Sequence, residues 1–306
     1  MTDIDLMKLD LFDPFKHFSA YATRLALRNV GLMKAILALS ARYSSLNHPP
    51  AAGGGGDHDA IQFYYETLHY LSTALQYTTY KQSEELLATA IVVSTYEMLD
   101  AATTTTTNTN TNSNWQRHLK GVFWIQRSQE VNGASGGLRQ AVWWAWLRQD
   151  LWGAFRERRR CFSFWQPVVD YPELGEDELA CRAVYLLSQA VNYVNSEAGG
   201  PETGTGVEQV RMRTERGDEL MGMLERWRSF TSSSFRSFPC HDRDKERHGW
   251  TPLWIHPPAF AAALQVYSFA KILVCLHRPV TTGFAGYRSF QVSLPILSQM
   301  LIVENT

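Results

Sequence analysis

The amino-acid sequence predicts an all-α protein, a large multi-helix bundle. Apolar residues recur every three or four positions over long stretches, which is the period of a helix buried on one side. No stretch shows the alternation that is typical of a strand. The clearest pattern forms two stripes, which consist of Leu25, Leu32, Ile36, Leu39 and Tyr43, and of Ile61, Tyr64, Leu68, Leu71 and Leu75.

The start of the next helix is marked by a capping signal. Ser83 offers a hydroxyl to the free backbone N–H groups of a first turn, and two acids follow it where the helix dipole favours negative charge. A helix is therefore expected from 83 to 100. Further helices are predicted over residues 115–131, 138–160, 176–195, 207–229, 257–278 and 288–303.

Polar or glycine-rich segments separate these helices. They lie near 44–57, 101–114, 195–206 and 231–250 and hold too little apolar surface to form elements of their own. We therefore expect surface loops there, within a single all-helical domain over residues 1–306.

Composition narrows the class of protein. The net charge is −1 and the sequence pI about 6.8, so the basic surplus of an autonomous nucleic-acid-binding domain is missing, and no direct sequence-specific DNA binding is expected. The four cysteines are far apart and fit no zinc spacing, so we expect no metal and no cofactor. The acidic opening is unlike a signal peptide, and no long uninterrupted apolar run is evident. The sequence predicts an intracellular protein, nuclear or cytoplasmic, without a membrane anchor.

Two segments resemble a known family. The segment 115–128 carries Trp115, His118 and Gly121, and the segment 141–159 carries an aromatic run followed by Arg148 and Asp150. They resemble the fungal-specific transcription factor domain, the helical regulatory region downstream of the zinc cluster (Zn2Cys6) in many fungal regulators. Weaker agreement extends over most of residues 10–300. The six closely spaced cysteines of the zinc cluster are absent, so we expect a stand-alone descendant of the domain or a shortened gene product.

The resemblance implies a transcriptional regulator or co-regulator that works through a DNA-binding partner protein. A secondary-metabolite pathway is the candidate target, and a homo-oligomer is the candidate assembly. The alternative is an enzyme on the same fold, a natural-product cyclase of the hetero-Diels–Alderase kind that binds a small apolar molecule in an aromatic cavity. The sequence leaves the choice open and identifies no catalytic residue.

Five residues are the candidates for a ligand site. His118 and Arg148 would donate hydrogen bonds, and the cavity walls would be formed by Trp143, Trp144 and Trp146. The competing interpretation is structural. Trp115 and His118 would then pack inward, Gly121 would let a neighbouring helix approach closely, and Arg148 and Asp150 would each pair with a residue on another helix.

Overall fold

The computed structural model describes residues 8–47, 55–103, 114–198, 206–238 and 254–279. Within these ranges the chain forms nine α-helices with short 3-10 or π turns between them, and the one β feature is an isolated bridge between Phe238 and Trp254. The predicted all-α class is confirmed. The α-helices are α2 (Thr23–Ala26), α3 (Val30–Asn47), α4 (Gly55–Ala74), α5 (Glu84–Thr103), α6 (Asn114–Ser128), α7 (Gly137–Glu157), α8 (Glu176–Val194), α9 (Gly206–Ser229) and α11 (Pro258–His277).

Helix ends fall close to their predicted positions because local capping fixes them. The Ser83 hydroxyl accepts a hydrogen bond from the backbone N–H of Leu86 at 3.1 Å, and α5 begins directly after it. At the start of α8, the Glu178 carboxylate accepts from the N–H of Gly175 at 3.0 Å. The helix predicted at 288–303 lies outside the described residues.

The chain divides into two compact units. The first comprises Met1–Asp150 with Phe162–Gln166, and the second comprises Leu151–Cys161 with Pro167–Thr306. Each unit is treated by itself below. The single domain expected from the sequence stays a prediction.

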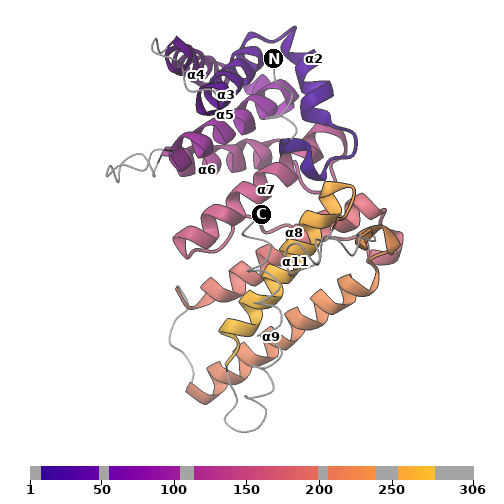
Figure 1. The fold of residues 1–306 in the computed structure, drawn as a ribbon. Coiled ribbons are helices and arrows are strands. Elements are labelled where there is room, and N and C mark those ends of the chain that lie inside the picture. The colour runs from indigo at the N-terminus through magenta and orange to yellow at the C-terminus, as the bar shows by residue number, and fades with distance from the viewer. Residues whose placement is uncertain (1–7, 48–54, 104–113, 199–205, 239–253, 280–306) are drawn as a thin grey trace. The chain divides into compact units, whose positions relative to one another are not determined.

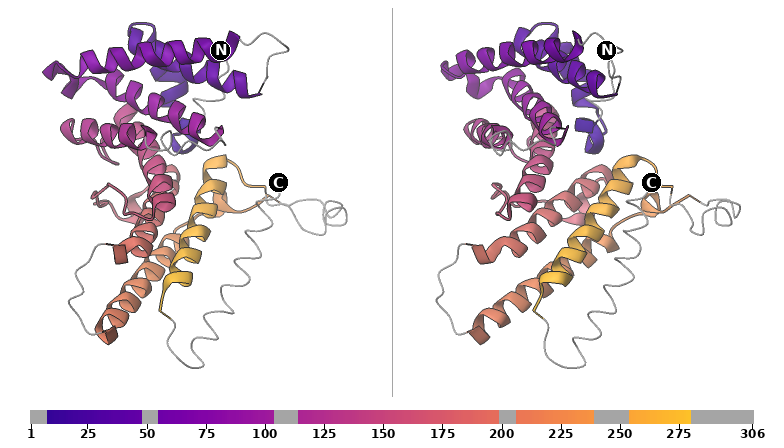
Figure 2. Two further views of the ribbon diagram at one scale, coloured as in Figure 1. Left: turned by 90° about the vertical axis from the view of Figure 1, so that its left-hand side faces the viewer. Right: turned by 60° about the vertical axis from the view of Figure 1, so that its left-hand side comes forward.

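In the first unit, α3 and α4 lie side by side, α5 packs against both, and α6 packs against α5 (Figure 1; Figure 2). The close approach of α3 and α4 depends on Gly31, where a Cβ atom would stand 2.0 Å from the ring of Tyr70. The Tyr70 hydroxyl accepts a hydrogen bond from Asn29 at 2.8 Å, and Lys34 pairs with Glu66 at 2.7 Å. A glycine in contact with an aromatic ring therefore sets the distance between these helices.

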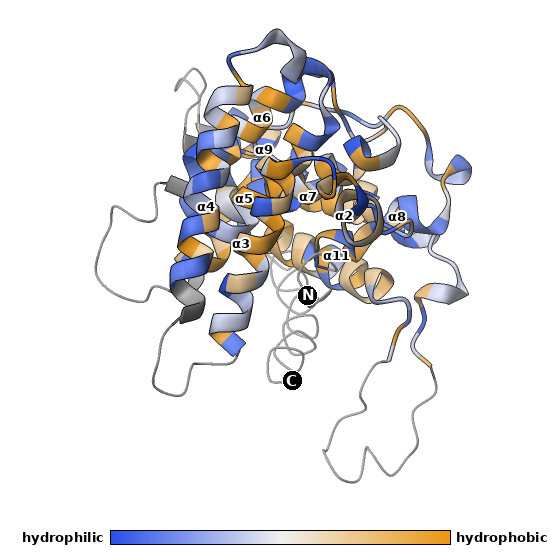
Figure 3. Ribbon diagram, turned by 90° about the horizontal axis from the view of Figure 1, so that it is seen from above, coloured by the Kyte–Doolittle hydropathy of each residue, from blue (hydrophilic) through white to orange (hydrophobic). Residues whose placement is uncertain are grey.

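The core of the first unit is built around α5. Its residues from Leu86 to Ser94 are all buried, and hydrophobic colour runs along the helix (Figure 3). A helix buried around most of its circumference must be covered by neighbours on several sides, which α3, α4 and α6 provide.

The second apolar stripe of the sequence lies along one flank of α4, with Leu75 directly after the last residue of the helix, and is only partly covered. Ile61 and Leu75 keep 48% and 41% of their surface exposed, whereas Ala60 and Thr67 are fully buried. The small side chains thus face the neighbouring helices, and part of the large apolar surface of α4 remains in contact with solvent.

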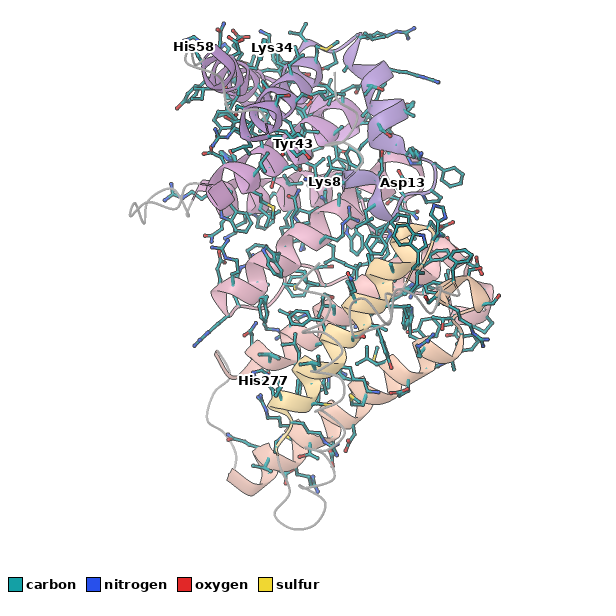
Figure 4. The ribbon with its side chains drawn as sticks, viewed as in Figure 1. Lys8, Asp13, Lys34, Tyr43, His58 and His277 are labelled. Atoms are coloured by element: carbon teal, nitrogen blue, oxygen red, sulfur yellow. The ribbon has the colours of Figure 1, made fainter. Side chains whose placement is uncertain are left out.

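The N-terminal segment is held on the first unit by polar contacts. The buried Asp10 carboxylate accepts hydrogen bonds from the N–H of Phe18, the N–H of Ser19 and the Ser19 hydroxyl, at 2.8, 2.8 and 2.6 Å. The Lys8 ammonium lies 4.7 Å from the ring centroid of Tyr43 on α3 (Figure 4). These contacts make the segment before α3 part of the folded unit.

In the second unit α8, α9 and α11 pack side by side. The fully buried Trp227 of α9 donates its indole N–H to the Leu179 carbonyl at 2.8 Å and stacks on Tyr267. By length and composition alone, α11 could also cross a membrane, and 44% of its most apolar window is buried against the rest of the protein. Its Lys271 pairs with Glu225 at 2.6 Å. The predicted absence of a membrane anchor stays a prediction.

Candidate functional site

Three helices of the first unit bring together Tyr64 of α4, Glu97 of α5 and His118 of α6. The same carboxylate oxygen, Oε1 of Glu97, accepts the Tyr64 hydroxyl at 2.6 Å and forms a short hydrogen bond with Nδ1 of His118. The Glu97 side chain is 7% exposed and that of His118 is 42% exposed. The cluster therefore joins a buried acid to an imidazole that solvent can reach.

The electrostatics of the cluster follow from this geometry. Because an ionised carboxylate can only accept, Nδ1 of His118 must carry the proton. The hydrogen bond to Glu97 raises the pKa of His118 above its ordinary value, although partial burial acts in the opposite direction. Burial, together with the neighbouring Glu97 carboxylate, raises the pKa of Tyr64. In the described part of the chain, the buried Oε2 of Glu97 has no hydrogen-bond partner.

The three predicted cavity tryptophans lie together in the core of the first unit. Trp143, Trp144 and Trp146 are 3%, 6% and 1% exposed. The indole N–H of Trp144 donates to the Gly133 carbonyl at 3.2 Å, and that of Trp146 donates to the Leu119 carbonyl at 3.1 Å. These contacts give the rings a packing role. Their role as walls of a ligand cavity stays a prediction.

Arg148 and His118 contact different parts of the first unit. Its Nη2 donates to the Leu9 carbonyl at 2.8 Å, and its guanidinium lies 5.3 Å from the ring centroid of Phe12. Arg148 therefore holds the N-terminal segment, while His118 holds α6 to α5. The proposed joint role of these two residues at one ligand also stays a prediction.

Two structural expectations from the sequence, for Asp150 and Gly121, have different outcomes. Asp150 accepts the backbone N–H of Phe162 at 2.7 Å, and its pairing with a residue on another helix stays a prediction. The expectation for Gly121 is wrong, because no atom of the described residues lies within 4 Å of its Cβ position, so this glycine does not mediate a close contact between the described helices. By contrast, Gly133 in the loop before α7 does lie against other side chains, because a Cβ atom there would stand 2.9 Å from the rings of Trp143 and Trp165.

Sequence reasoning missed Glu97 and a set of buried amides. The signal for Glu97 was available, since it is the one acid within the apolar run from Leu86 to Leu99. Gln149 is satisfied by Ser94 at 2.7 Å and Thr95 at 2.9 Å. Gln126 is 2% exposed, and among the described residues neither atom of its amide has a hydrogen-bond partner. A spacing pattern does not reveal which buried amides are satisfied.

Metal ligands do not gather in the described ranges, which contain no group of three or more His, Cys, Asp or Glu side chains placed to hold an ion. Of the described cysteines, Cys161 and Cys181 are buried and Cys275 is partly exposed.

Residues 9–129 match a known family, the fungal specific transcription factor domain. The matched segment includes α3 to α6 and all three residues of the Tyr64–Glu97–His118 cluster. The predicted resemblance is thus confirmed over these residues, whereas the second motif segment, 141–159, lies outside them. No curated protein and no protein of solved structure matches the chain. Over residues 9–129 the chain is thus similar to a fungal transcription factor regulatory domain, and this similarity agrees with the predicted intracellular location.

Proposed function

We propose that this chain regulates transcription in the nucleus, as a regulator or co-regulator that reaches its target genes through a DNA-binding partner. The observation that carries the proposal is the family match over residues 9–129, which form the α3–α6 core of the first unit. The net charge of the chain supports the proposal that a partner protein, and not this chain, binds the DNA. Affinity for DNA comes largely from neutralising phosphates, and a net charge of −1 offers no cationic surplus for that purpose.

The Tyr64–Glu97–His118 cluster is where the regulatory unit would respond to its surroundings. It joins three helices through one carboxylate oxygen, so any change at the half-exposed His118 acts directly on the contact between α5 and α6. The cyclase alternative stays a prediction. The contacts of the described tryptophans and of Arg148 are those of packing and anchoring residues, so we base the proposal on regulation.

A tethering experiment tests the proposal. The chain is fused to a heterologous, sequence-specific DNA-binding domain and expressed in a fungal strain that carries a reporter gene with the matching site. We expect reporter expression to change several-fold relative to the DNA-binding domain alone. Equal expression from both, with equal amounts of protein, would contradict a regulatory function.

Two tryptophan variants of α6 and α7 make the experiment specific to the folded unit. Trp146→Ala removes a ring that is 1% exposed and should abolish the response, because such a change costs about 3–5 kcal/mol of stability. Trp124→Ala removes a ring that is 56% exposed and should leave the response intact. In parallel, anisotropy titrations of the unfused chain at physiological salt should find no sequence-selective DNA binding.

A further inference from the structure

One charged sequence pattern occurs twice in the chain. An arginine, any residue, a second arginine, any two residues and then a serine or threonine are found over residues 158–163 and again over residues 226–231. Arginine-directed serine/threonine kinases recognise this spacing, because carboxylates in the substrate groove pair with guanidinium groups that lie five and three residues before the acceptor. The pattern is the same in both copies, whereas the structure around them differs.

The first copy lies in the irregular segment that follows α7. We call it the Ser163 motif and define it as residues 158–164. Arg158 and Arg160 are exposed, and among the described residues neither guanidinium has an acidic partner. Phe164, which directly follows the acceptor, is 81% exposed. The side chains that a kinase recognises are therefore accessible in the folded chain.

The hydroxyl of Ser163 is not committed to a structural role. It accepts one long hydrogen bond, from the backbone N–H of Trp165 at 3.3 Å, and in the described part of the chain its own proton has no acceptor. A phosphoryl acceptor gives up this proton to the catalytic aspartate of the kinase. A half-buried hydroxyl without a hydrogen-bond acceptor suits that reaction.

The second copy is occupied by contacts of its own. Its arginines lie on α9, where Arg226 pairs with Asp170 at 2.6 Å and Arg228 donates to the Thr231 hydroxyl. That hydroxyl donates in turn to the Arg228 carbonyl at 2.7 Å. Trp227, between the two arginines, is fully buried. A kinase groove that binds its substrate as an extended peptide would have to unwind the end of α9 to reach this copy.

We propose that Ser163 is a phosphorylation site for an arginine-directed serine/threonine kinase, and that Thr231 is not. In the reaction Oγ of Ser163 forms a bond to the γ-phosphorus of MgATP, and the bond from that phosphorus to the β,γ-bridging oxygen breaks. The hydroxyl proton passes to the kinase aspartate and ADP leaves. The product carries an added charge of about −1.5 to −2. This inference does not rest on the proposed regulatory function, because phosphate incorporation is measured on the purified chain.

Two backbone contacts hold the Ser163 motif on the protein. The N–H of Cys161 donates to the Asn192 side chain and the N–H of Phe162 donates to Asp150, each at 2.7 Å, and Cys161 is itself buried. Neither residue supplies a side chain that the kinase recognises. We therefore expect the folded chain to be a slower substrate than a free peptide of residues 156–166, but still a substrate.

Phosphate incorporation into the full chain tests the proposal. The chain is incubated with MgATP and a purified kinase that requires arginine at both positions, and the modified residue is mapped by mass spectrometry. We expect phosphate on Ser163. Ser163→Ala should abolish incorporation, and the matched control Thr231→Ala should leave it unchanged. Phosphate on Thr231 in place of Ser163, or incorporation that Ser163→Ala does not reduce, would overturn the proposal.

Arginine variants and two peptides separate the sequence motif from its accessibility. Arg158→Ala and Arg160→Ala should each lower kcat/KM at least about tenfold, because each removes a charge-assisted hydrogen bond to the kinase. Arg156→Ala is the control, since Arg156 is an exposed arginine of the same segment outside the motif. Free peptides of residues 156–166 and 224–234 should both be phosphorylated. A full chain that takes up no phosphate while the first peptide does would refute the site, and an inert second peptide would refute the protection of Thr231 by the fold.

Discussion

Removal of the His118 imidazole should weaken the first unit in a way that depends on pH. His118→Ala takes away one of the two donors on Oε1 of Glu97 and leaves the buried carboxylate with Tyr64 alone. A buried group that loses its partner costs about 1–3 kcal/mol. Because 42% of the His118 side chain is exposed, water replaces part of the lost bond, so we expect a loss near 1 kcal/mol in the free energy of unfolding.

The direction of the pH dependence follows from the raised pKa of His118. A histidine whose pKa is higher in the folded state contributes its full stabilisation below the unfolded pKa of about 6.5 and loses it as pH rises through the folded value. The difference in unfolding free energy between wild type and His118→Ala should therefore be largest at mildly acidic pH and shrink toward alkaline pH.

Urea denaturation at a series of pH values measures this difference, and an NMR titration of the imidazole gives the pKa of His118 directly. Glu97→Gln is the control, because it keeps a carbonyl oxygen for Tyr64 and His118 but removes the negative charge that stabilises the imidazolium. In that variant the pKa of His118 should fall. A wild-type His118 pKa at or below about 6.5, or a difference that grows as pH rises, would refute the reasoning.

Three further predictions concern packing and buried polar groups. Gln126→Leu should raise stability by about 1 kcal/mol in urea denaturation, since the amide is buried without a partner in the described structure; a comparable fall would instead indicate a bound water or polar ligand. Arg148→Ala should lower the free energy of unfolding by about 1–2 kcal/mol, because the Leu9 carbonyl loses its donor. Hydrogen exchange in the N-terminal segment should become faster, and unchanged exchange there would contradict this anchoring role. In thermal melts Gly133→Ala should destabilise the protein by about 1–3 kcal/mol. Gly121→Ala, whose new methyl group contacts no atom of the described residues, should stabilise it by up to about 1 kcal/mol. Equal melting temperatures of the two variants would show that the ring contacts at Gly133 are unimportant.

The helices could be predicted from the sequence because the information that ends a helix is local. The Ser83 cap precedes α5 directly, and α11 begins at Pro258, in the first helical turn where proline is tolerated. The family resemblance in the segment 115–128 was also readable, since it depends on residue types at fixed spacing.

Contacts between helices were harder to predict, because helical periodicity shows which face of a helix is apolar but not which helix packs against that face. Gly121 and Gly133 are equally small, yet only Gly133 lies under aromatic rings. Of the large residues of the α4 stripe, Tyr64 faces α5, but Ile61 remains 48% exposed, whereas the small side chains of Ala60 and Thr67 are fully buried. For the candidate site, His118 was identified but its partner Glu97 was not, because the pair is formed by two helices that are 21 residues apart at the contact.

The Asp10 carboxylate has a practical consequence for anyone who wishes to isolate the matched domain. Three donors from Phe18 and Ser19 converge on it, and Arg148 reaches back to the adjacent Leu9. A fragment that begins at α3 would thus expose the surface that the N-terminal segment covers. A fragment that ends at residue 129 would lack Arg148, which binds this segment through the Leu9 carbonyl. The smallest piece expected to behave well in solution therefore starts no later than Lys8 and continues through α7, well past the limit of the family match.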